Sequence, residues 1–169
     1  DTAVDTAIEE YVPDILCSAF VHSCIRRGKT IKEGGSKYDF ISGLQVGIAN
    51  LCNSMAAIKK LVFEEQRITK KQLLDAIEGD FEGKEAEKIR YLLLNFAPKY
   101  GNDDDYVDLL LKDAYLQFIN ELDQYHTTRH NRGPIGCRYY AGTSIISANE
   151  PNGSVVPATP DGRKAFTPV

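Results

Sequence analysis

The chain has 169 residues, of which 43% are hydrophobic, and it carries a formal net charge of −4 at pH 7. This length suffices for one domain with one core, and the ordinary apolar fraction argues against a disordered chain. The acidic balance argues against a nucleic-acid partner, which needs a concentrated basic face. No apolar run approaches the roughly 20 residues of a membrane span and no secretory signal opens the chain, so we expect a cytoplasmic protein with no membrane partner.

The first third of the chain predicts a long amphipathic helix and a glycine pair. Apolar residues recur at helical spacing over residues 7–27, where Pro13 interrupts the pattern. Gly28 is well placed to end this helix. The adjacent Gly34 and Gly35 permit backbone approaches that a side chain would obstruct. Further along, Gly43 and Gly47 lack the G-K-[ST] of a phosphate-binding loop, and we expect them to allow close packing at a helix start.

The spacing of apolar residues predicts four more helices. The strongest signal covers residues 49–65, and Thr69 is placed to cap a shorter helix over residues 70–77. The next helices are predicted over residues 85–96 and 107–125. The sequence is therefore mostly helical up to a basic, turn-rich stretch.

Strand signals are confined to the last quarter. Residues 143–148 are the first convincing strand, residues 150–153 predict a turn, and residues 154–156 are a candidate for a second extended piece. One strand cannot form a sheet, and the final residues predict no closing helix or strand. We therefore expect the strand to pair with material outside these residues, as in a piece of a larger protein.

Cysteine and histidine spacing predicts no metal site. The four cysteines lack C-x-x-C spacing and are expected to be reduced thiols that act as small buried hydrophobes: Cys17, Cys24, Cys52 and Cys137. His126 and His130 lie four apart, a spacing that can bind zinc with a third ligand, but no H-E-x-x-H pattern accompanies them. We favour histidines that interact with the dipole at a helix end.

Residues 97–108 are the most informative stretch of the chain. A proline ends an apolar helical run, and three consecutive aspartates follow at residues 103–105. Adjacent carboxylates repel one another and cost solvation when buried, so this cluster faces water or cations. With Asn102 the aspartates suit the first turn of the next helix, and we expect a cap rather than a catalytic group.

Several separated motifs in a fixed order carry a family resemblance. They are Gly34-Gly35, Ile48-Ala49-Asn50, the run from Ser54 to Lys60, the run from Tyr100 to Asp104, and the run from Thr159 to Arg163. In these motifs the chain resembles the glycyl radical enzymes related to pyruvate formate-lyase, from about residue 20 to the end. The motifs resemble the dehydratase, decarboxylase and eliminase branch of the family more closely than pyruvate formate-lyase itself. The family's enzymes are much longer, so the resemblance implies an internal segment.

The resemblance implies a fold and a chemistry. The fold is a ten-stranded α/β barrel, of which residues 1–169 would be an incomplete, mostly helical part that contributes one or two strands. In the family, an activase with an iron–sulfur cluster and S-adenosylmethionine installs a glycyl radical, which generates a thiyl radical at a cysteine. The thiyl radical abstracts hydrogen from a small-molecule substrate, and a C–C, C–O, C–N or C–S bond breaks. The implied partners are the substrate, the activase, the remainder of the barrel and a second copy in a homodimer.

Neither radical residue has a counterpart in this chain. The Gly-Cys-x-Glu and Arg-Val-x-Gly-aromatic motifs are absent, and Gly136-Cys137 is followed by Tyr139 where the family has glutamate. Gly136-Cys137 also comes after Gly34, whereas the family's cysteine loop precedes it. We therefore expect no catalytic residue here, no directly bound cofactor, and no activity of the isolated segment.

The resemblance places one turn near the substrate. Its residues are Asn149, Glu150, Asn152 and Ser154. Many relatives have an aromatic residue at the position of Asn152 and an apolar residue or histidine at that of Glu150, so a more polar contact is expected, to a hydroxyl or ammonium group. Ordinary turn chemistry also explains these residue types. For Arg163 a structural role is expected, because its guanidinium can brace a loop through several carbonyls or a carboxylate.

Two other functions fit the sequence. One is a catalytically inactive helical accessory or binding protein derived from the family, which would be stable and monodisperse at 18.8 kDa. An enzyme segment would instead expose apolar strand edges. The other is a spare-part subunit that replaces a damaged region. The family's spare parts supply the glycine end, which this chain lacks, so this reading is the weaker.

Overall fold

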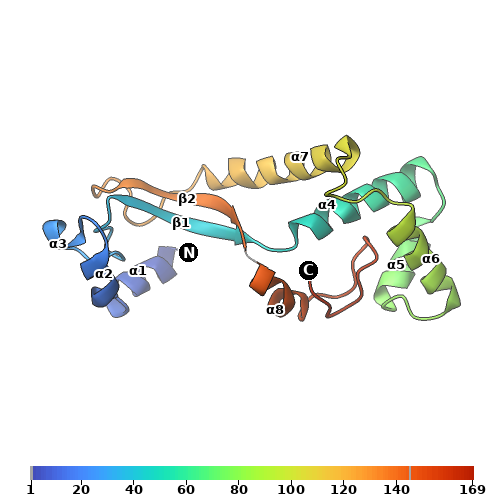
Figure 1. The fold of residues 1–169 in the computed structure, drawn as a ribbon, viewed down its shortest axis with the longest axis horizontal. Coiled ribbons are helices and arrows are strands. Elements are labelled where there is room, and N and C mark those ends of the chain that lie inside the picture. Colours follow the sequence, from blue (N-terminus) through green and yellow to red (C-terminus); the bar gives the residue numbers. More distant parts are fainter. Residues whose placement is uncertain (1, 145) are drawn as a thin grey trace. The chain divides into compact units, whose positions relative to one another are not determined.

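The computed structural model describes residues 2–144 and 146–169. The chain divides into two compact units (Figure 1). The first comprises Asp1–Leu44 with Phe118–Gly142, and the second comprises Gln45–Gln117 with Thr143–Val169. Within the described residues, no helix is both long and apolar enough to cross a membrane.

The first predicted helix is broken into three. They are α1 (Thr2–Tyr11), α2 (Ile15–Phe20) and α3 (Cys24–Arg27). Pro13 lies in the first break, where it lacks the N–H that a continuous helix needs. The side chain of Asp14 then caps α2 by accepting a hydrogen bond from the Cys17 N–H at 3.3 Å. Gly28 ends α3 in the left-handed conformation, which confirms its predicted role.

The sheet of the described residues has two strands, β1 (Tyr38–Gln45) and β2 (Ile135–Thr143). They run parallel, because the Ile135 N–H donates to Lys37 O and the Ser144 N–H donates to Gln45 O, both at 2.9 Å. Figure 1 shows the two strands side by side and the helices α4 to α7 between them in the chain. Parallel strands require such a crossover connection.

The strand predicted over residues 143–148 is wrong. β2 ends at Thr143, residue 145 lies outside the described residues, and Ile146–Ala148 is the 3₁₀-helix η2. The predicted turn after it is the short helix α8 (Asn149–Gly153), which accommodates Pro151 because the first helical turn needs no N–H there. Residues 154–156 form no strand. The true strands were hidden by their glycine, serine and charged residues, which are typical of turns.

Gly43 and Gly47 have different roles. Gly47 adopts a positive φ of 76° directly before α4 (Ile48–Ala57), as expected for a helix start. The same expectation is wrong for Gly43, which lies in β1. A Cβ there would sit 3.3 Å from the Phe118 ring, so Gly43 permits α7 to pack closely on the strand.

The remaining predicted helices are confirmed, with one change of type. Their bounds are α5 (Lys70–Glu78), α6 (Lys84–Asn95) and α7 (Asp105–Leu122). Thr69 and Gln72 form a reciprocal capping box at the start of α5. The helix predicted over residues 49–65 is α4 followed by the π-helix η1 (Ile58–Glu64). Ion pairs five positions apart join Lys59 to Glu64 and Lys60 to Glu65, at 4.0 Å each, and fit the i→i+5 period of a π-helix.

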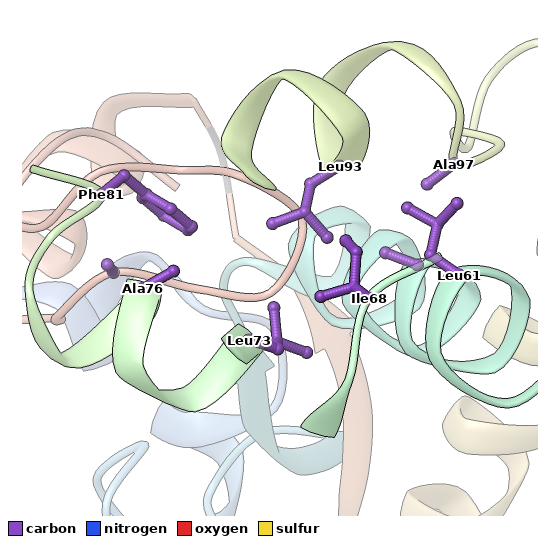
Figure 2. Close-up of a cluster of buried hydrophobic side chains, with 9 residues drawn as sticks. Leu61, Ile68, Leu73, Ala76, Phe81, Leu93 and Ala97 are labelled. Atoms are coloured by element: carbon purple, nitrogen blue, oxygen red, sulfur yellow. The ribbon is translucent and has the colours of Figure 1, made fainter. Parts of the chain in front are cut away.

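The larger of two buried apolar clusters in the second unit joins several of its helices (Figure 2). Its buried members are Ala57, Leu61, Ile68, Leu73, Ala76, Phe81, Leu93, Ala97 and Ala158. Leu61 comes from η1, Leu73 from α5 and Leu93 from α6, so the cluster joins these three helices. Ala158 belongs to the irregular segment after α8, and its burial here fixes that segment on the helices.

Candidate functional site

The four predicted substrate-binding residues lie together at α8. Asn149, Glu150 and Asn152 are within this helix and Ser154 follows it. The Asn152 amide donates to Ala148 O at 2.7 Å, and the Ser154 hydroxyl donates to Pro151 O at 2.8 Å. Two of the side chains are thus engaged by nearby backbone. Contact with a substrate stays a prediction for all four.

Glu150 is the charged member of this group and has a free carboxylate. It is exposed, and its carboxylate has no hydrogen-bond or ion-pair partner among the described residues. A free carboxylate can accept hydrogen bonds from hydroxyl or ammonium groups. Of the predicted site residues, Glu150 is therefore the best suited to bind a polar molecule directly.

The last residues of the chain hold α8 in place. The Val169 N–H donates to Asn149 O at 3.2 Å. A Cβ on Gly153 would lie 2.2 Å from Thr167 O, so this close approach requires glycine. These last residues end or directly follow the segment of residues 156–167, here called the bracing loop, so the position of the predicted site depends on how this loop places them.

Arg163 holds the bracing loop together. Its side chain is 9% exposed, and its two terminal nitrogens donate to four backbone carbonyls. The shorter bonds are 2.7 Å to Thr167 O and 2.5 Å to Pro157 O. This arrangement confirms the brace predicted from the guanidinium geometry.

Asp161 ties the bracing loop to α4. One carboxylate oxygen accepts hydrogen bonds from the Thr159 hydroxyl at 2.6 Å and the Arg163 N–H at 3.3 Å. The other accepts from the Asn50 amide at 2.8 Å. The motifs around Asn50 and Asp161, 111 positions apart, therefore meet in the folded chain.

A cavity of about 400 Å³ lies beside the bracing loop, within the second unit. We call it the loop cavity. Its charged lining consists of Arg90, Lys99, Asp161, Arg163 and Lys164. Four of these five groups are cationic, which makes the loop cavity a place where anions are favoured.

The first unit contains a buried ion network that the sequence did not predict. Arg129 is 4% exposed and pairs with Asp39 through its Nε, and with Asp5 through Nη1 at 2.8 Å. Desolvation by burial raises the pKa of Asp5, but hydrogen bonds from Thr128 and Arg129 outweigh it, and the net pKa is lowered. A Cβ on Gly34 would lie 2.8 Å from the Arg129 side chain, so Arg129 can pack at this position only because residue 34 is glycine. No local signal could have revealed this network.

The acidic cluster is a helix cap, as predicted. The Tyr106 N–H donates to Asp104 Oδ1 at 3.0 Å, and the Val107 N–H donates to Asp104 O at 3.0 Å. Asp105 lies in the first turn of α7, where the helix dipole stabilises its negative charge.

Two expectations for single side chains need correction. Cys24, Cys52 and Cys137 are buried thiols, but Cys17 is exposed on α2. The histidine rings stack with centroids 3.8 Å apart, yet the helix-end explanation is wrong because α7 ends at Leu122. In the described ranges, no three metal-ligating side chains gather in one place.

The thiol of Cys137 has no feature of a reactive cysteine. It donates to Pro134 O at 3.3 Å, and burial raises its pKa. Thiol reactivity depends on the thiolate, which a raised pKa disfavours. The raised pKa argues against a nucleophilic thiolate, whereas the exclusion of Cys137 as a radical site rests on the sequence around it, because hydrogen-atom abstraction acts on the neutral thiol.

Comparisons with known proteins agree over most of the chain. The family model described as "Pyruvate formate lyase-like" matches residues 1–153. The chain is 62% identical to a probable dehydratase of Escherichia coli, YbiW, over 98% of this chain and 20% of that protein. It is 35% identical to the (2S)-3-sulfopropanediol dehydratase of Klebsiella oxytoca, over 98% of this chain and 19% of that one.

Solved structures of dehydratases are similar to this chain over almost its whole length. A structure described for 1,2-propanediol dehydration in Roseburia inulinivorans has a TM-score of 0.84 and 41% identity, and it covers 99% of this chain and 21% of its own. The hydroxyproline dehydratase of Clostridioides difficile has a TM-score of 0.85 and 31% identity, with 99% and 20% covered. The chain thus spans about a fifth of the length of the curated relatives it matches.

Proposed function

This chain belongs to the pyruvate formate lyase-like family of glycyl radical enzymes, and we propose that it is part of the barrel of a dehydratase for a small hydroxylated metabolite. The observation that carries the proposal is the 62% identity to a probable dehydratase over 98% of the chain. In such a reaction a diol loses water and becomes a carbonyl compound, with no net oxidation or reduction. No external oxidant or reductant is consumed.

We propose that the radical residues lie in parts of the enzyme outside this chain. The chain contains neither the Gly-Cys-x-Glu nor the Arg-Val-x-Gly motif, so its own residues bind and position. When present, the glycyl radical supplies the hydrogen abstraction that starts turnover. We propose that a separate activase with an iron–sulfur cluster and S-adenosylmethionine installs it, and that the whole enzyme is a homodimer.

Exposed apolar residues support a larger enzyme body. In the first unit, Leu16 is 74% exposed, Phe20 83% and Ile25 76%, which is unusual for large apolar side chains on one short segment. Parallel sheets normally have both faces covered and more than two strands. We propose that the remainder of the barrel covers these side chains and pairs with β1 and β2, so that residues 1–169 are an incomplete domain.

The first test is the mass and radical content of the natural polypeptide. We expect an intact mass several times 18.8 kDa. After anaerobic activation, electron paramagnetic resonance should detect an organic radical, and short-chain diols should yield carbonyl products. A natural mass near 18.8 kDa would contradict the proposal and favour the accessory protein.

Within the proposed enzyme, Glu150→Gln tests substrate contact at α8. The exposed carboxylate would lose a charge-assisted hydrogen bond to a substrate hydroxyl, worth about 1.5–3 kcal/mol. We expect kcat/KM for the preferred diol to fall by about tenfold or more. Glu85→Gln, at an exposed glutamate on α6 that pairs with Lys88, is the matched control and should leave kcat/KM unchanged. Equal kinetics of the two variants would remove Glu150 from the site.

A further inference from the structure

The loop cavity gathers cations that no carboxylate pairs with. The Arg90 Nε donates to Gly162 O and the Lys99 Nζ donates to Asp161 O, each at 2.9 Å. These acceptors are neutral backbone carbonyls. None of the ion pairs found among the described residues includes a cation of the loop cavity. The hydrogen bonds hold these groups in place but leave their charge uncompensated.

The single carboxylate in the lining is already engaged. Asp161 accepts hydrogen bonds from Asn50, from the Thr159 hydroxyl and from a backbone N–H. Burial lowers the pKa of Lys99, and the charge of Asp161 offsets only part of this effect. The lining consequently keeps an excess of positive charge in a partly desolvated place, where a bound anion is most stabilising.

The Nε of Arg163 adds a second observation. Its side chain is 9% exposed and lines the loop cavity, yet this nitrogen is buried and has no acceptor among the described residues. Because this nitrogen has almost no accessible surface, it contributes unpaired positive charge beside the loop cavity rather than a shown direct contact. The other nitrogens of Arg163 are occupied by the bracing loop, so Nε is the donor that remains.

From these contacts we propose that the loop cavity binds a small dianionic oxyanion, such as inorganic phosphate or sulfate. Arg90 and Lys99 donate to the carbonyls of consecutive residues, which brings both cations to the same part of the lining. A volume of about 400 Å³ accommodates such an ion with its remaining waters. The site is separate from α8 and requires no radical chemistry.

Crystals of the natural full-length polypeptide soaked in selenate test the proposal directly. Selenium scatters anomalously, and we expect a peak within hydrogen-bond distance of Lys99 Nζ and Arg90. Calorimetric titration with phosphate supplies the affinity. Lys99→Met removes a charge and keeps an apolar stem, and we expect it to weaken phosphate binding by about tenfold or more.

Lys71→Met is the matched control, since Lys71 is exposed on α5 and pairs with Asp75. It should bind phosphate like the unchanged protein. The proposal is overturned by a loop cavity that stays empty at saturating selenate, or that contains an acidic side chain from another part of the polypeptide. Unaltered phosphate affinity of Lys99→Met overturns it as well. None of these results depends on the radical reaction, so the proposed enzyme function stands or fails separately.

Discussion

Arg129→Met is expected to lower the free energy of unfolding by about 3–5 kcal/mol, because it leaves two buried carboxylates without their cation. Asp5 is 8% exposed and Asp39 is 7% exposed, so water replaces the lost guanidinium poorly. The variant also loses the hydrogen bond from Arg129 Nη1 to Lys32 O, at 3.1 Å. Urea unfolding of the purified protein, followed by circular dichroism, measures the change.

The control for this variant is Arg132→Met. Arg132 pairs with Glu9 at 3.1 Å, but its side chain is 49% exposed, and such pairs contribute less than about 1 kcal/mol. A loss at Arg129 no larger than the loss at Arg132 would show that the buried network does not stabilise the fold.

The same network predicts how the difference depends on pH. The folded-state pKa of Asp5 lies below its usual value of 3.8, so its contribution is present above about pH 4 and is lost as the pH falls through the lowered pKa. In Arg129→Met the carboxylate keeps the desolvation and loses the cation, so its pKa rises. The two proteins should therefore approach one another in stability below about pH 4, and a constant difference down to pH 3 would contradict this account.

Local signals predicted those features whose partners are near in sequence. The sequence predicts the cap at Thr69, and in the structure Thr69 caps α5 through a capping box with Gln72, three positions along. Gly28 and Asp104 act on the helix end next to them, and both roles are confirmed. In each case the hydrogen bonds join residues within one helical turn, so the sequence pattern contains the whole interaction.

Features that depend on distant partners were missed. Arg129 contacts Asp39 and Asp5, 90 and 124 positions away, and nothing near Arg129 indicates burial. β1 and β2 were missed for a related reason, because parallel strands are stabilised by pairing across a long crossover rather than by a local hairpin turn. Gly34 was correctly predicted to permit a close approach, but the approaching group, Arg129, became visible only in the fold.

The bracing loop was predicted differently, from the chemistry of one side chain. Arg163 presents several donors in a fixed plane, and four backbone carbonyls accept from its two terminal nitrogens. Arg163→Met leaves those carbonyls without their donor. We expect the free energy of unfolding to fall by about 3 kcal/mol or more, since each bond to a charged donor contributes about 1.5–3 kcal/mol.

Arg163→Lys separates charge from geometry. A lysine keeps the positive charge, but its single ammonium cannot reach both the carbonyl of Thr167 and that of Pro157, so most of the loss should remain. Lys164→Met removes a neighbouring exposed charge and should change the unfolding free energy by less than about 0.5 kcal/mol. If Arg163→Lys were as stable as the unchanged protein, charge alone would hold the bracing loop. The position of α8 would then not depend on the planar guanidinium, because the contacts of Gly153 and Asn149 with the last residues would persist without it.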